Sequence, residues 1–262
     1  MGKNIFLFEA KRQRADFFLW TAAITAALWG LTVGVYPIFE ESADEMKKVM
    51  AGFPPQFAAA FSIDTANLFS FGGFYSFCFS YLGVMGAIMA SSLALSIFSR
   101  ERRAKCSDFL FTRPVSRGRA FCCKLLAGLA LLALSNAVYL AAAAAIGRKN
   151  DTPLLLAGLS LFFTQLVFFA LGAFYAVFAK KVRSVSGAAT AFGFGAFLMT
   201  ALLNLTGEAW LRYLAPLKYF EPAYVFAEGG YEFKYAITGL FVGAAGTLCA
   251  YLRYTKSDVS AA

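Results

Sequence analysis

The sequence predicts an all-α integral membrane protein with six transmembrane helices. Hydrophobic residues make up 60% of the chain and charged residues only 15%, which is too few charges to cover a water-soluble globule of 262 residues. Nearly all residues also fall in, or close to, apolar runs that are long enough to span a bilayer. Lys and Arg gather in alternate connections between these runs. We therefore expect one membrane domain that includes residues 1–262.

The first 36 residues predict a short interfacial helix followed by a membrane span. Residues 1–14 interleave four Lys and Arg residues with a short apolar run, a pattern typical of a helix at the membrane surface. Residues 15–36 are mostly apolar, and 22 residues in a helix measure ~33 Å, enough to cross the hydrocarbon core. This run is longer than the about 7–15 apolar residues of a cleaved signal peptide, so we expect an uncleaved anchor.

Five further apolar runs predict the remaining spans. They cover residues 71–99, 120–146, 154–179, 185–205 and 235–252. Residues 37–70 predict an outer loop, because four acidic residues between positions 40 and 45 are followed by a helix-breaking Pro54-Pro55 pair. Residues 206–234 form a second long outer interval, in which aromatic residues mixed with glutamates suit the membrane–water boundary.

The distribution of basic residues predicts the orientation. If both termini are cytosolic, 17 of the 24 Lys and Arg residues lie on the cytosolic side and 7 lie outside, as the positive-inside rule requires. Six spans satisfy the even number that this arrangement needs. The bias also explains the net charge of +9 without nucleic acid, whose binding proteins gather basic residues on a solvated face. We expect a multi-pass protein of the cell membrane with no nucleic-acid partner.

Enzymatic chemistry is disfavoured by what the sequence lacks. It contains no histidine, which is the commonest general base and the commonest zinc ligand. Its five cysteines show no spacing typical of a metal site or a disulfide framework. Motifs of the types G-x-x-x-x-G-K-[ST], H-E-x-x-H and G-x-S-x-G are absent. We expect no catalytic residue, no metal and no bound cofactor in this chain.

Three amide side chains are the strongly polar groups embedded in the predicted spans: Asn136, Gln165 and Asn204. Polar groups inside a membrane are candidates for contact with a transported substrate. The alternative is a hydrogen bond to a neighbouring helix, which is the commoner role of a single amide. No cluster of charges lies inside a span, which disfavours proton relays and ion-coupled transport.

The most polar interval between two spans is residues 100–124, RERRAKCSDFLFTRPVSRGRAFCCK. It contains eight Lys and Arg residues against two acidic residues, Glu101 and Asp108. Glu101 and Lys105 have the i,i+4 spacing that favours a helix, and Pro114 would end that helix at about Arg113. One interpretation is a short cytosolic helix that docks a partner. The other is a topology signal that contacts lipid headgroups and nothing more.

This interval resembles the signature of type-2 ATP-binding-cassette exporter permeases. In that family the stretch commonly reads E-x-x-x-G-T-x-E-x-L-L-x-x-P-V-S-R and is followed by a lysine, here Lys124. The Gly-Thr pair is replaced by Lys105-Cys106, and the second glutamate by Asp108. Residues 214–222, LAPLKYFEP, are similar to the family's L-x-P-x-x-Y-F-x-P segment before span six. The similarities occur in order along nearly the whole chain.

The resemblance implies a permease subunit that forms the substrate path and is not itself an enzyme. Two copies of a separate ATPase would bind ATP and Mg, and a second permease, identical or homologous, would complete the transporter in the lipid membrane. A cytosolic coupling helix between spans two and three would contact the ATPase, and a re-entrant segment would precede span six. The implied coupling residues are Glu101, Arg102, Arg103, Asp108, Arg113, Pro114 and Arg117, and those of the re-entrant segment are Pro216, Tyr219, Phe220 and Pro222.

One function of a different class remains compatible with the sequence. A membrane scaffold or sensor subunit could dock a cytosolic partner through the same basic interval without moving a substrate. For a transporter, the sequence leaves the substrate class open among peptides, drugs, lipids and ions, because the spans offer amides and aromatic rings but no charge cluster.

Overall fold

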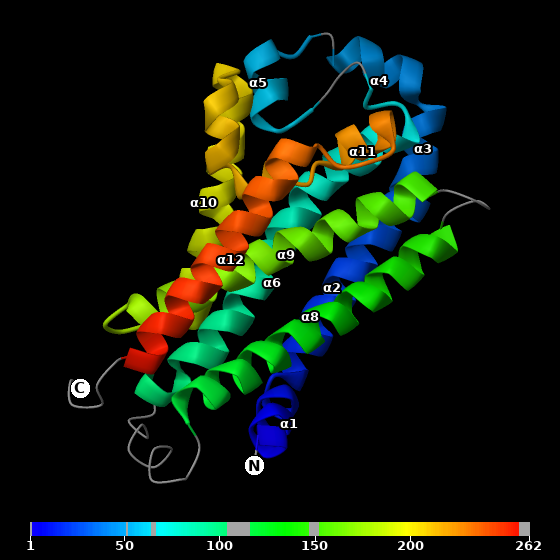
Figure 1. The fold of residues 1–262 in the computed structure, drawn as a ribbon. Helices are drawn as coiled ribbons and strands as arrows, with labels where there is room; N and C mark the ends of the chain where they lie inside the picture. The colour runs from blue at the N-terminus through cyan, green and yellow to red at the C-terminus, as the bar shows by residue number, and fades with distance from the viewer. Residues whose placement is uncertain (1, 51, 64–66, 104–115, 147–151, 257–262) are drawn as a thin grey trace.

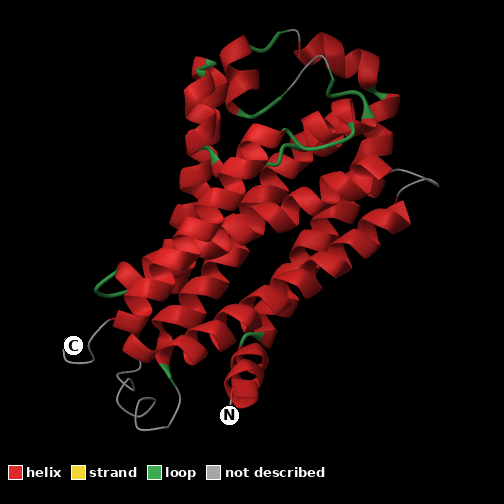
Figure 2. Cartoon of the chain, viewed as in Figure 1, coloured by secondary structure: helices red, strands yellow, loops and turns green. Residues whose placement is uncertain are grey.

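The computed structural model describes residues 2–50, 52–63, 67–103, 116–146 and 152–256, and this part of the chain is helical, with no strand (Figure 2). The elements are α1 (Gly2–Arg12), α2 (Arg14–Trp29), η1 (Gly30–Val35), α3 (Tyr36–Glu41), α4 (Ala43–Met50), α5 (Pro55–Ala60), α6 (Phe71–Arg103), α8 (Arg117–Ile146), α9 (Thr152–Phe178), α10 (Val185–Thr206), η2 (Ala209–Leu214), η3 (Pro216–Lys218), α11 (Pro222–Glu228) and α12 (Phe233–Lys256). The all-α prediction is confirmed.

Six helices in the described ranges are long and apolar enough to cross a membrane, as predicted. They are residues 14–41, 71–100, 117–146, 153–178, 185–206 and 233–256. The predicted spans agree with them, and the differences lie at helix ends. Helix α6 continues to Arg103, beyond the predicted end at residue 99, and α8 begins at Arg117 rather than at residue 120. A helix can carry long basic side chains at its ends near the membrane surface, because these side chains place their charged groups in water.

The first span is longer than predicted because the helix continues through Pro37. Residues 30–35 form the π-helical turn η1, in which the Tyr36 amide donates to the Leu31 carbonyl, and Pro37 stands at the start of α3. Proline has no amide hydrogen, so the first turn of a new helical segment is the place where it costs least. Residues 37–63, expected as an outer loop, therefore contain three short helices, α3, α4 and α5.

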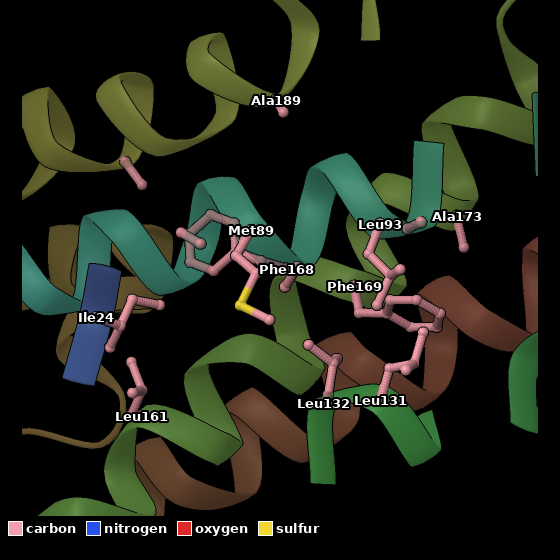
Figure 3. Packing of buried hydrophobic residues seen from close by; sticks show 14 of the residues in the cluster. Ile24, Met89, Leu93, Leu131, Leu132, Leu161, Phe168, Phe169, Ala173 and Ala189 are labelled. Atoms are coloured by element: carbon pink, nitrogen blue, oxygen red, sulfur yellow. The ribbon is translucent and has the colours of Figure 1, made fainter. Parts of the chain in front are cut away.

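Helices α6 and α9 form the centre of the bundle. Helix α6 packs on α2, α9 and α10, while α9 also packs on α8 and α12. Buried residues make up 72% of the most apolar stretch of α6 and 61% of that of α9, against 17% for α12. Figure 3 shows the buried side chains of this core, among them Met89 and Leu93 of α6 and Phe168 and Phe169 of α9. The outer helices therefore present most of their surface to the outside of the bundle.

The helix ends separate into two groups at opposite ends of the bundle (Figure 1). At one end lie α1, the last turn of α6, the first turn of α8, the connection 179–184 and the C-terminal end of α12. At the other end lie α3, α4, α5 and α11. We call these the inner end and the outer end. This arrangement agrees with the predicted even number of spans and with termini on one side.

Gly172 permits the close approach of α9 to α6, which yields the first prediction. A Cβ atom at Gly172 would lie 3.0 Å from Ala94 Cβ and 3.1 Å from the Ser91 carbonyl oxygen. We expect Gly172→Val to destabilise the folded protein by about 1–3 kcal/mol through overpacking. The matched control is Gly195→Val in α10, where an added Cβ meets nothing within 4 Å. Thermal unfolding of both variants in one detergent tests this; equal unfolding temperatures would contradict it.

Candidate functional site

The inner end contains a largely buried ion pair between α1 and α6. Glu9 Oε2 lies 2.7 Å from Arg100 Nη1, and the two side chains are only 5% and 17% exposed. The Arg100 guanidinium also lies 6.0 Å from the centre of the Phe8 ring. An ion pair of this geometry has charge-assisted hydrogen bonding in a poorly solvated place, so separating the partners would be costly. It fixes α1 to the last turns of α6.

A second polar contact lies one turn earlier on α6. Gln13 Nε2 donates to Ser96 Oγ at 2.9 Å, and Gln13 is buried between α1 and α2. Helix α1 also packs along α8. Its Leu7 and Phe8 side chains are exposed, as on a helix that lies at a membrane surface. The interfacial position of α1 stays a prediction.

One feature of the sequence relates to this contact. Glu9 is the one acidic residue among the basic residues of positions 1–14. Its partner, Arg100, lies 91 positions away, directly before the predicted coupling residues. Spacing along the chain cannot pair two such residues, because the pairing arises only when α1 folds back against α6.

The predicted coupling residues lie around this inner end. Glu101, Arg102 and Arg103 belong to the last turn of α6, and Arg117 is the first residue of α8. The remaining three, Asp108, Arg113 and Pro114, lie outside the described residues, as does the predicted coupling helix. The structure thus gives the two helix ends that hold the interval, next to the Glu9–Arg100 ion pair.

Lys124, which follows the interval in α8, is a buried cation. Its side chain is among the largest that are fully buried, and its ammonium lies 5.6 Å from the centre of the Tyr254 ring in α12. Contact with the face of an aromatic ring stabilises a cation that is buried away from water. Lys124 therefore links α8 to α12 at the inner end.

Two of the three predicted pathway amides lie together in the middle of the bundle. Asn136 Nδ2 of α8 donates to Gln165 Oε1 of α9 and also to the Leu132 carbonyl at 3.1 Å. Gln165 Nε2 lies 3.6 Å from the sulfur of Met89 in α6. Both amides are buried. Their contacts join three helices, which is the structural role of embedded amides.

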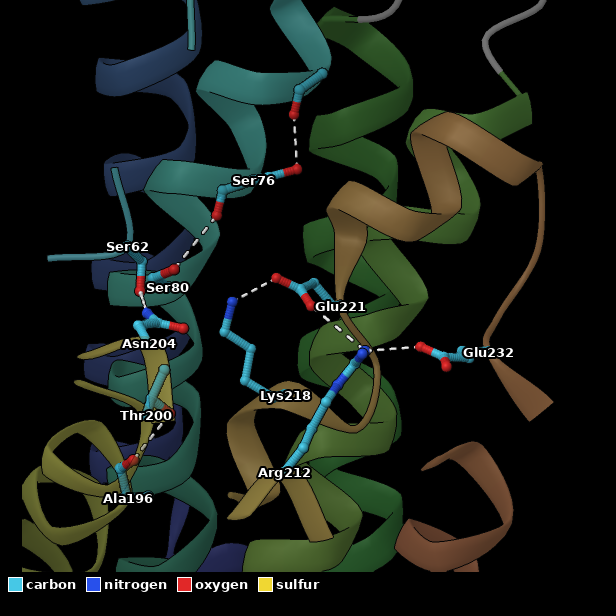
Figure 4. A network of polar contacts seen from close by, with 11 residues as sticks. Ser62, Ser76, Ser80, Ala196, Thr200, Asn204, Arg212, Lys218, Glu221 and Glu232 are labelled. Carbon is cyan, nitrogen blue, oxygen red and sulfur yellow. Dashed lines mark hydrogen bonds and ion pairs between the residues drawn. The ribbon is translucent and has the colours of Figure 1, made fainter. Parts of the chain in front are cut away.

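Asn204, the third amide, lies apart from the other two, at the outer end of α10. Its Nδ2 donates to Ser62 Oγ at 2.9 Å, directly after α5. There it lines a pocket of 430 Å³, which we call the outer pocket. Other polar residues of the lining include Ser76 and Ser80 of α6, Lys218 and Glu221, which Figure 4 shows, and also Asn67 and Ser70. The structure therefore divides the predicted pathway residues between the bundle interior and the outer pocket.

Beside the outer pocket lies a network of charged side chains, and we call the four of them drawn in Figure 4 the outer charge cluster; Lys234, which pairs with Glu232 at 3.1 Å, adjoins it. Arg212 Nη2 lies 2.9 Å from Glu232 Oε2 and 3.4 Å from Glu221 Oε2, and Lys218 Nζ pairs with Glu221 Oε1. The Arg212 guanidinium lies 3.9 Å from the centre of the Tyr235 ring. These contacts hold η2, η3 and the first turns of α11 and α12 together. The sequence contained the charges, but their pairing depends on how the segment folds.

The four predicted re-entrant residues belong to this outer segment. Pro216 begins η3 and Pro222 begins α11, as suits a residue without an amide hydrogen. Tyr219 and Phe220 are buried. Phe220 stacks on Phe163 of α9 at 5.1 Å. The segment is packed into the bundle, and its depth in the membrane stays a prediction.

Two further contacts hold the segment against the bundle. Gly239 of α12 provides room for the Phe220 ring, because a Cβ there would lie 2.8 Å from Phe220 Cζ. The Tyr231 hydroxyl, between α11 and α12, donates to the Leu156 carbonyl of α9. Burial raises the pKa of Tyr231 to about 12, still further above neutral pH than the ordinary value of a tyrosine, and the hydroxyl is protonated and donates.

Removal of Arg212 tests the outer charge cluster. We expect Arg212→Gln to destabilise the protein by about 1–3 kcal/mol, because Glu221 and Glu232 keep their partly buried charges without this partner. The control is Lys47→Gln, which removes an exposed partner of Asp44 and should change little. Thermal unfolding, together with proteolysis of residues 207–232, measures the effect. Equal unfolding temperatures and equal proteolysis rates of the two variants would show that the cluster contributes no stability.

Comparison with known proteins places this architecture in a family. A family model described as "ABC-2 family transporter protein" matches residues 3–259, nearly the whole chain. None of the curated proteins compared with the chain matches it. The match runs from α1 to the end of α12 and includes both the inner end and the outer pocket. The chain therefore belongs to the ABC-2 family of transporter membrane proteins.

Proposed function

We propose that this chain is the permease subunit of an ATP-binding-cassette exporter, that it forms the substrate path, and that a separate ATPase subunit drives it. The family match over residues 3–259 is the observation that carries the proposal. Six apolar helices supply the walls of a path, and the family is one of membrane transport proteins. ATP and Mg belong to the partner ATPase.

The proposed ATPase contact is the interval 101–117 at the inner end. Glu101, Arg102, Arg103, Asp108, Arg113, Pro114 and Arg117 are the residues assigned to it. The Glu9–Arg100 ion pair supports this assignment, because it ties α1 to the helix turn directly before the interval. Movement of the interval would then displace α1 and α6 together. Such rigid linkage is what a transporter needs to pass ATPase closure to its spans.

The assembly would contain two permeases and two ATPases in the cell membrane, with the inner end in the cytosol. The excess of Lys and Arg on the cytosolic connections supports this orientation, as does the position of α1 and the end of α12 on one side. Among the assigned pathway residues, Asn204 has the best structural support because it lines a pocket. Asn136 and Gln165 would act where α8 and α9 meet.

Charge reversal in the interval tests the ATPase contact. We expect Glu101→Lys and Asp108→Lys to lower the ATP hydrolysis of the assembled complex by about tenfold, because each places a cation where the ATPase would meet an anion. Insertion into the membrane should be unchanged. The control is Glu45→Lys in α4 at the outer end. Full hydrolysis in both inner variants would argue for a scaffold or sensor that does not couple to an ATPase, and an equal loss in the control would show that the effect is not specific to the interval.

Exchange of the ion-pair charges tests the link between α1 and α6. We expect Glu9→Arg and Arg100→Glu each to reduce ATP-driven activity to below about a third, because like charges then face one another in a buried place. The double variant restores opposite charges and should recover most of the activity. Assays of all three in one reconstituted preparation distinguish linkage from loss of single residues. A double variant no better than either single one would contradict the link.

A further inference from the structure

The outer pocket differs in chemistry from the other large hollows of the bundle. The pocket has a volume of 430 Å³ and lies between α5, α6, α10 and the segment of η3 and α11. Hydroxyl, amide and charged groups line its wall. A hollow of 510 Å³ between α8, α9 and α12 is lined almost entirely by apolar side chains, as suits a surface facing lipid tails. The outer pocket is therefore suited to a polar group.

Two serine hydroxyls of this wall, those of Ser76 and Ser80, present acceptors to the pocket because each donates its own hydrogen to a backbone carbonyl. Ser76 Oγ donates to the Gly72 carbonyl at 2.7 Å, and Ser80 Oγ donates to the Ser76 carbonyl at 3.4 Å. Asn204 places one amide hydrogen on Ser62 Oγ. A hydroxyl whose hydrogen is used in this way keeps lone pairs for a ligand. A bound group can therefore donate to Ser76 and Ser80, while Ser62, which accepts from Asn204, keeps its own hydrogen to donate.

The charges that reach the pocket are paired with one another. Lys218 pairs with Glu221 Oε1, and the other carboxylate oxygen of Glu221 faces Arg212 at 3.4 Å. An ionic group would have to compete with these pairs. The Lys218 ammonium has three hydrogens and can also donate to an uncharged acceptor. A hydroxyl group both donates and accepts, so it matches the serine oxygens and Lys218 without breaking an ion pair.

A narrow extension leads from the outer pocket between α6 and α10. It shares Ser76, Ser80, Lys218 and Glu221 with the pocket, holds only 20 Å³, and continues past apolar side chains. The apolar residues along it are Phe79, Phe197, Leu217 and Pro222, and Gly83 and the polar Thr200 complete its lining. Since α6 runs from the outer to the inner end, Gly83 lies deeper in the bundle than Ser76. The extension points from a polar head site toward the hydrocarbon core.

We propose that the outer pocket binds the head of an amphiphile whose head is uncharged and rich in hydroxyls, as in a glycoside. Its apolar tail would pass toward the seam between α6 and α10, where the extension of 20 Å³ must widen to admit it. The inference deepens the proposed function, since such an amphiphile would be the exported substrate at its exit. Binding itself needs no ATPase, so the two proposals fail separately.

A cysteine reporter at the pocket tests this. Ala223 is exposed and lines the outer pocket, so Ala223→Cys places a thiol there without removing a polar group. The full chain, with all natural cysteines except the buried Cys78 replaced by alanine, is studied in lipid nanodiscs. The rate of thiol modification by a water-soluble maleimide is measured with octyl glucoside, octyl sulfate or octyltrimethylammonium below micelle-forming concentrations. The glucoside should slow modification at least about threefold more than either ionic probe at equal concentration.

Matched serine variants identify the origin of the protection. Ser76→Ala, and in a second variant Ser80→Ala, should raise the half-protecting concentration of octyl glucoside by about threefold to tenfold. Ser99→Ala should leave it unchanged, because Ser99 also donates to a carbonyl one turn back but lies at the inner end of α6. Equal protection by all three probes, stronger protection by an ionic probe, or no effect of both pocket variants would overturn the inference. None of these results depends on ATP hydrolysis.

Discussion

The close contact between α6 and α9 is the constraint on which the rest of the molecule depends. In a bilayer, lipid tails compete equally for apolar side chains, so helices associate through tight packing and through hydrogen bonds. Gly172 brings the α9 backbone against Ala94 and Ser91, and buried residues form more of these two helices than of the other spans. Helices α2, α8, α10 and α12 are placed by this central pair.

Helix α6 also connects the two polar ends of the molecule. It carries Arg100 at the inner end, where Glu9 holds α1, and Ser76 and Ser80 at the outer end, where they line the outer pocket. The middle of the bundle has apolar packing and the amide contact between Asn136 and Gln165. Helix α6 is one continuous helix from Phe71 to Arg103, so a displacement of its inner end can be transmitted to the outer pocket. The proposed function requires this linkage.

Sequence reasoning succeeded where one property decides the structure. Hydropathy and length place all six spans, because a bilayer demands long apolar helices with internally satisfied backbones. It failed at Pro37, where a π-helical turn lets the helix continue. It also could not pair Glu9 with Arg100, or Asn204 with Ser62, which lie 91 and 142 positions apart. These pairings follow from helix packing, which a single sequence does not reveal.

Purification of the full chain from its native membrane in a mild detergent tests whether an ATPase couples to its inner end. Mass spectrometry and an ATP hydrolysis assay are applied to the same sample. We expect an ATP-binding-cassette ATPase in about equal molar amount to this chain, and ATP hydrolysis that is higher in the complex than in the separated ATPase. A purified chain with no ATPase and no hydrolysis would contradict it.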